Sequence, residues 1–345
     1  MARQAGDDET DEAHPRATTV LFGHAQAEAA LLAAYRSARM PHGFLLAGPK
    51  GIGKATLAYR MARFVFAHPD PAERRVQSAT SLEIDAQGPV TRRIAAQAQP
   101  DLLVIERTVN ERGVLHKQIA VEDIRRTVPF FGSTAGEGGW RVAIVDAVDD
   151  LNRSGANALL KVLEEPPERG LILLVSHSAA RVPATLRSRC RILTLRSLDE
   201  SDVAAAAAVA TGAAADDPDI AVAAAAADGS VARSLAFLDE GALALREQAL
   251  NLLNRLPALD PKALHALGDA LTGTDPQPLA GFLDTVNGWL SARLNGGRAE
   301  LRRLVRLAEA SERINASARN VEIYNLERKP LVFSVFGLLA EATRG

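Results

Sequence analysis

The sequence is poor in the features that would assign it to a specialised class of protein. It has one cysteine, Cys190, among 345 residues, so no disulfide can form within the chain. Its 40 Lys and Arg residues are balanced by 42 Asp and Glu residues, a net charge of −2, so the whole chain has no electrostatic preference for nucleic acid or membranes. Its apolar runs, such as residues 171–175, are far too short to cross a bilayer. We therefore expect a cytoplasmic protein, and the length allows two or three domains.

The N-terminal residues are polar and acidic. Residues 6–12 read Gly-Asp-Asp-Glu-Thr-Asp-Glu, which is neither the basic region nor the apolar core of a signal peptide. Because such a segment has little apolar surface to bury, it cannot offset the entropy lost on ordering. We expect residues 1–15 to form a disordered acidic tail.

The rest of the chain divides into two parts with different sequence patterns. Up to Leu195, short apolar runs alternate with helical patterns, as expected for a parallel sheet with helices on both faces. The expected strands are 44–47, 102–105, 142–145, 171–175 and 192–195. After Ser197 the strand signal ends, and alanine-rich and Leu-rich amphipathic stretches predict helices alone.

These sequence patterns predict an α/β fold class and three ordered domains. We expect an α/β domain with a parallel sheet at 16–196, a small helical domain at 197–243 and a larger all-helical domain at 244–345. In the last domain, bulky side chains are expected to fill the core or an interface, and a core position is the first expectation for each. They are Trp289, Leu290, Tyr324 and Phe333.

A glycine-rich loop follows the first expected strand and precedes a helical pattern. The order strand, glycine loop, helix is the one that phosphate binding needs. Glycines let backbone N–H groups turn toward a phosphate, the helix N-terminus adds a favourable dipole, and the lysine can reach the outer phosphates. The alternative is a plain glycine-rich turn. The candidate nucleotide-binding residues are Gly48, Gly51, Gly53, Lys54, Ala55 and Thr56.

The residue after Lys54 is unsuited to a metal ion. A phosphate-binding loop of this kind has Ser or Thr there, whose hydroxyl binds Mg²⁺, whereas Ala55 offers a methyl group. Thr56 lies about 100° further around the helix, so its hydroxyl can substitute only if the loop shifts. The loop can still bind ATP or ADP through its backbone and Lys54, but we expect Mg²⁺ binding to be impaired.

A second motif is the apolar strand that ends at Asp146. In nucleotide hydrolases such an aspartate orients the shell of the magnesium ion, and an adjacent glutamate polarises the attacking water. Here the adjacent residue is Ala147, and Asp149 and Asp150 are expected to be loop or helix-terminal charges. Each lost catalytic group costs about two to four decades in rate. We therefore expect the chain to have no ATPase activity of its own.

Two further positions bear on a nucleotide site. Ser176 follows the expected strand 171–175, where a polar side chain either senses a phosphate or caps the strand. Arg189 stands in the loop before the last expected strand, and arginine presents a planar fork of donors that can reach a neighbouring subunit's phosphates. A lone loop arginine is more often a solvated charge. In a chain without the parts for its own hydrolysis, however, Arg189 is a candidate catalytic residue in trans.

Three stretches together resemble one family closely. They are Gly-Pro-Lys-Gly-Ile-Gly-Lys at 48–54, Ala-Asn-Ala-Leu-Leu-Lys-Val-Leu-Glu-Glu-Pro-Pro at 156–167 and Ala-Thr-Leu-Arg-Ser-Arg-Cys at 184–190. They resemble the clamp-loader branch of the AAA+ ATPases, over roughly residues 21–195, and most narrowly its non-hydrolysing member in bacterial DNA polymerase III. The resemblance implies a subunit of the replicative DNA polymerase III holoenzyme, a nucleotidyltransferase by membership only, that takes part in loading the sliding clamp onto primed DNA.

The resemblance also implies partners and residue roles. Arg189 would complete the ATP site of an adjacent gamma- or tau-type motor subunit, and the last domain would be a helical collar in a hetero-pentamer that includes a delta subunit. The small helical domain at 197–243 would be the family's lid, and Arg233 would take the place of its second phosphate-sensing arginine, with a solvated helix charge as the alternative. Family members often have a four-cysteine zinc site, but residues 64–101 contain no cysteine, so no zinc is expected. An autonomous DNA-stimulated ATPase motor with a degenerate site is the alternative left open.

Overall fold

The structure is a computed structural model, and the chain divides into two compact units, Met1–Ala232 and Arg233–Gly345. Residues 1–13, most of the predicted tail, lie outside the described residues. None of the helices in the described ranges is long and apolar enough to cross a membrane. The described residues are 14–37, 40–108, 116, 118–132, 139–214, 216–239, 241–273, 275–295, 301–324 and 326–344.

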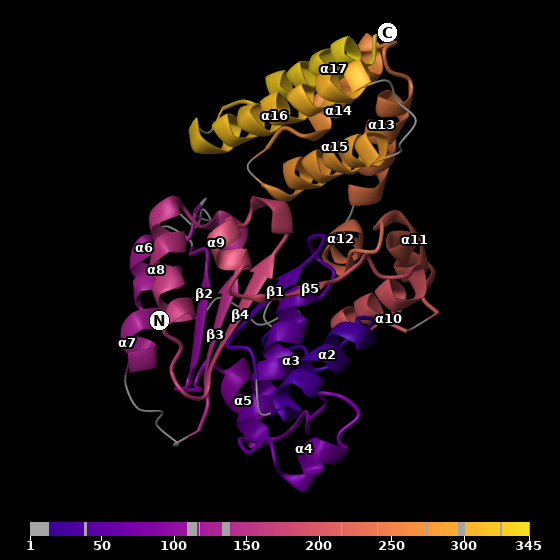
Figure 1. Ribbon diagram of the computed structural model, residues 1–345. Helices are drawn as coiled ribbons and strands as arrows, with labels where there is room; N and C mark the ends of the chain where they lie inside the picture. The colour runs from indigo at the N-terminus through magenta and orange to yellow at the C-terminus, as the bar shows by residue number, and fades with distance from the viewer. Residues whose placement is uncertain are drawn as a thin grey trace, which may run out of the picture. The chain divides into compact units, whose positions relative to one another are not determined.

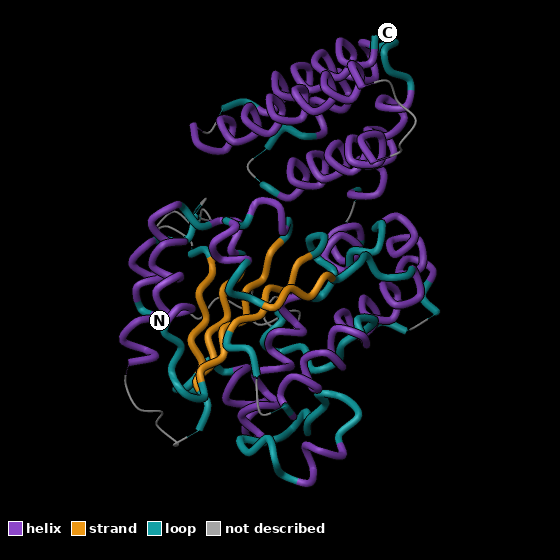
Figure 2. Tube along the Cα trace, viewed as in Figure 1, coloured by secondary structure: helices purple, strands orange, loops and turns teal. Residues whose placement is uncertain are grey.

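The first unit is built on a five-stranded parallel sheet (Figures 1 and 2). The strand order is β2-β3-β4-β1-β5, so β1 lies near the centre and β5 at an edge. All five expected strands occur, which confirms the predicted α/β class. The strands are β1 (Gly43–Ala47), β2 (Leu102–Glu106), β3 (Arg141–Asp146), β4 (Gly170–Ser176) and β5 (Arg191–Thr194).

Helices cover both faces of this sheet, because alternate residues of each strand point to opposite faces. On one face, Phe44 and Leu46 join a core with helices α2, α3 and α5. On the other face, Leu45 and Ala47 join a core with α6 to α9. Figure 1 shows these two groups of helices on either side of the strands. Burial on both faces explains why the strands are continuous apolar runs in the sequence.

The helical segments of the first unit include three that the sequence suggested clearly: the helix after the glycine loop and two alanine-rich helices after the sheet. In the described residues the helical segments are α2 (Ala25–Arg36), α3 (Lys54–Ala67), α4 (Arg74–Ser78), α5 (Pro89–Ala95), α6 (Val121–Arg125), α7 (Thr127–Gly132), η1 (Val148–Asp150), α8 (Arg153–Glu164), η2 (Ala179–Arg181), α9 (Ala184–Arg187), α10 (Glu200–Thr211) and α11 (Pro218–Ala226).

The second unit is all helical, and its helices share one apolar core. Trp289 and Leu290 are buried in it, and Phe333 packs against it. The expectation of a core position is wrong for Tyr324, which is 67% exposed, because it is the last residue of its helix and lies beyond the buried stripe. Helix α12 (Val231–Phe237) begins in the first unit; the others are α13 (Ala242–Asn254), α14 (Pro261–Ala270), α15 (Gln277–Asn295), α16 (Leu301–Tyr324) and α17 (Arg328–Thr343).

Candidate functional site

The glycine-rich loop joins the carboxyl end of β1 to the first turn of α3. Gly51 and Gly53 have φ angles of 77° and 96°, in the left-handed region that side chains disfavour. The Gly48 N–H donates to the Ser176 carbonyl (3.2 Å), which ties the loop to the end of β4. The predicted loop residues therefore follow one another from strand to helix as the sequence indicates, with Lys54, Ala55 and Thr56 opening α3.

The glycines of this loop are also required by packing inside the chain. A Cβ atom at Gly51 would lie 2.3 Å from Ser230 Oγ and 2.7 Å from Ala232 Cβ, and one at Gly48 would lie 2.3 Å from the Leu195 carbonyl oxygen. The Ala232 N–H donates to the Gly51 carbonyl (3.2 Å). The segment after α11 thus packs directly on the loop, so its glycines serve the fold as well as any phosphate.

Lys54 is almost completely buried in this loop, with 3% of its surface exposed. Its ammonium donates to the Pro49 carbonyl. Burial lowers the pKa of Lys54 to about 8, although the nearby Asp146 carboxylate opposes this shift. Burial, together with Glu106, raises the pKa of Asp146 to about 6. The loop lysine and the strand-end aspartate therefore form one buried electrostatic site at the carboxyl end of the sheet.

Asp149 holds the end of β4. Its carboxylate accepts from the Ser176 hydroxyl (3.0 Å), from the His177 N–H (2.6 Å) and from the Ser178 N–H (3.1 Å). Ser176 is fully buried, so its hydroxyl is used inside the chain in this structure. Burial and the positive charge of Lys54 lower the pKa of His177 to about 4. The sequence interpretation of Asp149 as a loop charge missed this role, because residues 27 positions apart make the contact.

Asp150, the other nearby carboxylate, pairs with Arg107. The Arg107 Nε atom lies 3.0 Å from Asp150 Oδ2. Both carboxylates, Asp149 and Asp150, are thus engaged by groups of the same chain. In the part of the chain that the structure describes, no three His, Cys, Asp or Glu side chains gather closely enough to hold a metal ion. The absence of zinc stays a prediction, as does the role of Arg233, which is the first residue of the second unit.

Arg189 lies at the opposite end of the sheet from the glycine loop. The next strand, β5, begins at Arg191 beside Phe44. A Cβ atom at Gly43 would lie 3.0 Å from Cys190 Sγ and 3.5 Å from the Arg189 carbonyl oxygen. The Arg189 backbone is therefore at the amino end of β1, whereas the glycine loop leaves the carboxyl end at Ala47. Four strand residues of about 3.3 Å each separate the two ends by about 13 Å.

The Arg189 side chain forms contacts at the surface. Its Nη2 lies 2.6 Å from Glu164 Oε1, at the end of α8. Its Nη1 donates to the Thr185 carbonyl (3.2 Å) and approaches Ser188 Oγ (3.5 Å). The Arg189 side chain remains 38% exposed. Burial raises the pKa of the adjacent Cys190 thiol to about 11, which suits a small packing residue and not a reactive thiolate.

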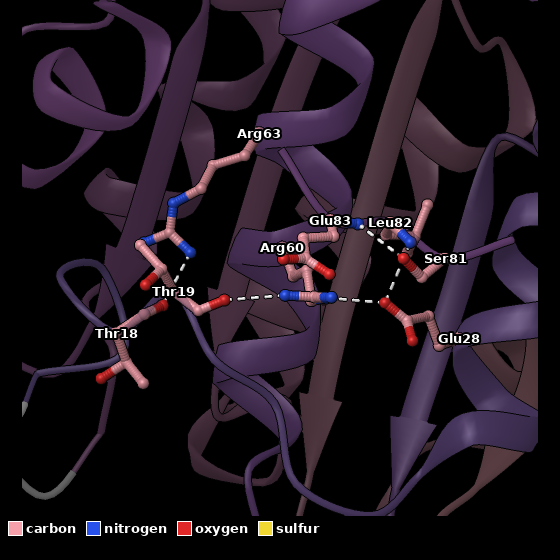
Figure 3. Close-up of polar contacts among 8 residues, drawn as sticks. All are labelled: Thr18, Thr19, Glu28, Arg60, Arg63, Ser81, Leu82 and Glu83. Atoms are coloured by element: carbon pink, nitrogen blue, oxygen red, sulfur yellow. Dashed lines mark hydrogen bonds and ion pairs between the residues drawn. The ribbon is translucent and has the colours of Figure 1, made fainter. Parts of the chain in front are cut away.

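Two arginines to which the sequence interpretation assigned no role lie on α3, and Figure 3 shows their polar contacts. Arg60 binds Glu28 Oε1 (2.6 Å) and the Thr19 carbonyl (2.7 Å). Arg63 donates to the Thr18 carbonyl (2.8 Å), and only 1% of its surface is exposed. These bonds fasten the segment before α2 onto α3. The signal was available: arginines at i and i+3 on an otherwise apolar helix need buried acceptors.

The chain resembles known replication proteins. The profile of the family described as "DNA polymerase III, delta subunit" matches residues 23–199. The chain is 34% identical over 153 residues to DNA polymerase III subunit delta' of Pseudomonas aeruginosa, covering 44% of this chain and 42% of that protein. It is 32% identical over 160 residues to the delta' subunit of Yersinia pestis, covering 46% and 43%. It is 28% identical over 165 residues to subunit tau of Escherichia coli, covering 48% and 23%.

The matched regions span less than half the length of each of these relatives. The family profile, by contrast, spans just over half of this chain and includes the glycine loop, the Asp146 strand and Arg189. The chain therefore belongs to the DNA polymerase III delta subunit family, as a clamp-loader subunit of the delta-prime type.

Proposed function

We propose that this subunit supplies Arg189 to the ATP site of an adjacent motor subunit during clamp loading and does not hydrolyse ATP itself. The observation that supports this most directly is the position of Arg189 at the amino end of β1. The Arg189 backbone lies beside the amino end of β1, and about 13 Å of strand separates that end from the glycine loop, which supports a role toward a phosphate bound by another chain. The exposed Arg189 side chain is available to another chain.

The chain's own loop has donors for a phosphate but lacks parts for hydrolysis. The backbone N–H groups of residues 48–53 and the Lys54 ammonium would hold a nucleotide, with Arg233 as a further proposed contact. Ala55 provides no hydroxyl for Mg²⁺, and Ala147 provides no carboxylate for a water molecule. A bound nucleotide would add binding energy there, and the residues present support no route to its cleavage.

The names of the relatives support the proposed partners. Relatives of this chain are named as delta', gamma and tau subunits of DNA polymerase III. We propose that gamma- or tau-type subunits are the motors that receive Arg189, in a hetero-pentamer with a delta subunit. The all-helical second unit would be the collar that joins the subunits. The assembled complex would act on the sliding clamp and primed DNA.

The test is ATP hydrolysis by a reconstituted complex that contains the Arg189→Ala chain. Because a trans-acting arginine stabilises charge that develops in the transition state, we expect the DNA-stimulated ATPase rate to fall about tenfold or more. Size-exclusion chromatography should show unchanged assembly. Arg191→Ala is the matched control, since Arg191 is an exposed arginine two residues away. An unchanged rate with Arg189→Ala would refute the proposal.

One observation favours the alternative of an autonomous ATPase with a degenerate site. Lys54 and Asp146 are both present and lie close enough to shift each other's pKa. The isolated chain decides between the two functions. ATP turnover stimulated by primed DNA and abolished by Lys54→Ala would support the motor, whereas the absence of turnover supports the trans-acting subunit.

A further inference from the structure

The contact between Glu164 and Arg189 joins two elements that are distant in sequence. Glu164 is the last residue of α8, and Arg189 follows α9. The two come together above Gly43, where the Leu163 and Cys190 side chains fill the space that a side chain at that position would occupy. Leu163 is buried and Cys190 is partly buried, and the ion pair of 2.6 Å forms at the exposed edge beside them.

We propose that Glu164 is a positioning residue that orients the Arg189 guanidinium before a partner's phosphate reaches it; this rests on the proposed trans role of Arg189. A guanidinium has five N–H donors in a fixed plane. Glu164 holds one terminal nitrogen, and the Thr185 carbonyl, with the Ser188 hydroxyl, holds the other. With both terminal nitrogens held, the plane is fixed, and the remaining donors are left for phosphate oxygens.

Such orientation matters because arginine has a long, flexible side chain. Binding a phosphate restricts its rotamers, and this loss of freedom opposes binding. A carboxylate that already restricts the side chain reduces the loss in the transition state. Both side chains of the pair are partly exposed, 38% for Arg189 and 47% for Glu164. The contribution should therefore be modest, as for other exposed ion pairs.

The experiment measures steady-state ATP hydrolysis by the reconstituted complex over a range of ATP concentrations. With Glu164→Ala, we expect kcat to fall about two- to fivefold with KM unchanged. Glu165→Ala is the matched control, since it removes the neighbouring exposed glutamate. Glu164→Gln, which keeps an acceptor, should restore part of the rate. In the Glu164→Ala, Arg189→Ala double variant, the rate should equal that of Arg189→Ala alone, because Glu164 acts through Arg189.

The outcomes separate this inference from the proposed function. If Arg189→Ala leaves the rate unchanged, both proposals fail. If Arg189→Ala lowers the rate but Glu164→Ala does not, the trans role stands and the positioning role is wrong. A faster rate with Glu164→Ala would also overturn it, because the carboxylate would then compete with the phosphate. If Glu164→Ala lowers the rate by the same factor in the Arg189→Ala background as in the native chain, Glu164 acts independently of Arg189.

Discussion

The two ends of strand β1 differ in how far their charged side chains are buried. At the carboxyl end, Lys54 and Asp146 are buried. Burial lowers the pKa of Lys54 and raises that of Asp146, so it favours the neutral form of each. At the amino end, the guanidinium of Arg189 stays at the surface in a single exposed ion pair. The carboxyl end is thus costly to build and bound up with the fold, whereas the arginine contributes little to folding. Substitutions at the two ends should therefore separate stability from activity.

The largest effect on stability is expected at the carboxyl end with Asp149→Ala. The change leaves the buried Ser176 hydroxyl and two backbone N–H groups without their acceptor. Losing charged hydrogen bonds of this kind should lower the free energy of unfolding by about 3 kcal/mol. Urea denaturation measures this loss. The control is Asp150→Ala, which removes a partly exposed ion pair with Arg107. Equal losses in the two variants would contradict the role given to Asp149.

The second prediction concerns the pH dependence of stability. The pKa of Asp146 is raised to about 6, so the folded chain binds the carboxyl proton more tightly than the unfolded chain does. The contribution of Asp146 to the free energy of unfolding is therefore present at low pH and falls as the pH rises from about 4 to 6. The pKa of His177 is lowered to about 4, so its contribution rises from about pH 4 to 6.5. The two slopes oppose each other in the native chain.

Single substitutions should expose each slope. Between pH 4.5 and 6.5, Asp146→Asn should become more stable with rising pH and His177→Asn less stable, each by about 2 kcal/mol. Urea midpoints at the two pH values measure this. Parallel profiles for both variants and the native chain would mean that these groups do not titrate as described.

A smaller loss is expected at the amino end with Gly43→Ala. The new methyl group would lie 2.7 Å from the nearest carbon of Leu163 and 3.0 Å from Cys190 Sγ, and overpacking of this kind costs about 1 kcal/mol or somewhat more. Gly281→Ala is the control, because nothing lies within 4 Å of its Cβ position. Thermal unfolding that ranks the control as the less stable variant would argue against close packing around Gly43.

The smallest effect on stability is expected for Arg189→Ala. Exposed ion pairs contribute little, so the free energy of unfolding should change by no more than about 0.5 kcal/mol. Together with a large loss of ATPase in the assembled complex, this result would place activity and stability at opposite ends of the sheet. A loss as great as that of Asp149→Ala would instead give Arg189 a structural role.

Local pattern predicted much of the fold, because the signals are local. Continuous apolar runs indicated all five strands, and the order of strand, glycine loop and helix indicated the position of Lys54. The sequence could not reveal contacts between distant elements, such as Asp149 with the end of β4 or Glu164 with Arg189. The spacing of Arg60 and Arg63 on an apolar helix was a signal for buried acceptors, but the sequence could not show that the acceptors of Arg63 are backbone carbonyls near residue 18. The predicted core position of Tyr324 was wrong because this residue ends its helix, beyond the last buried residues of the apolar face.

All strands of the sheet run the same way, and that parallel order has a consequence for symmetry. A subunit that receives an arginine from one neighbour at one end of the sheet and supplies an arginine to another neighbour at the other end makes head-to-tail contacts. Such contacts use two different surfaces and have no twofold axis. A row of such subunits has a direction. Under the proposed function, this subunit gives an arginine and needs none in return, so it marks one terminus of the row. The assembly would then have at least one fewer working ATP site than it has subunits.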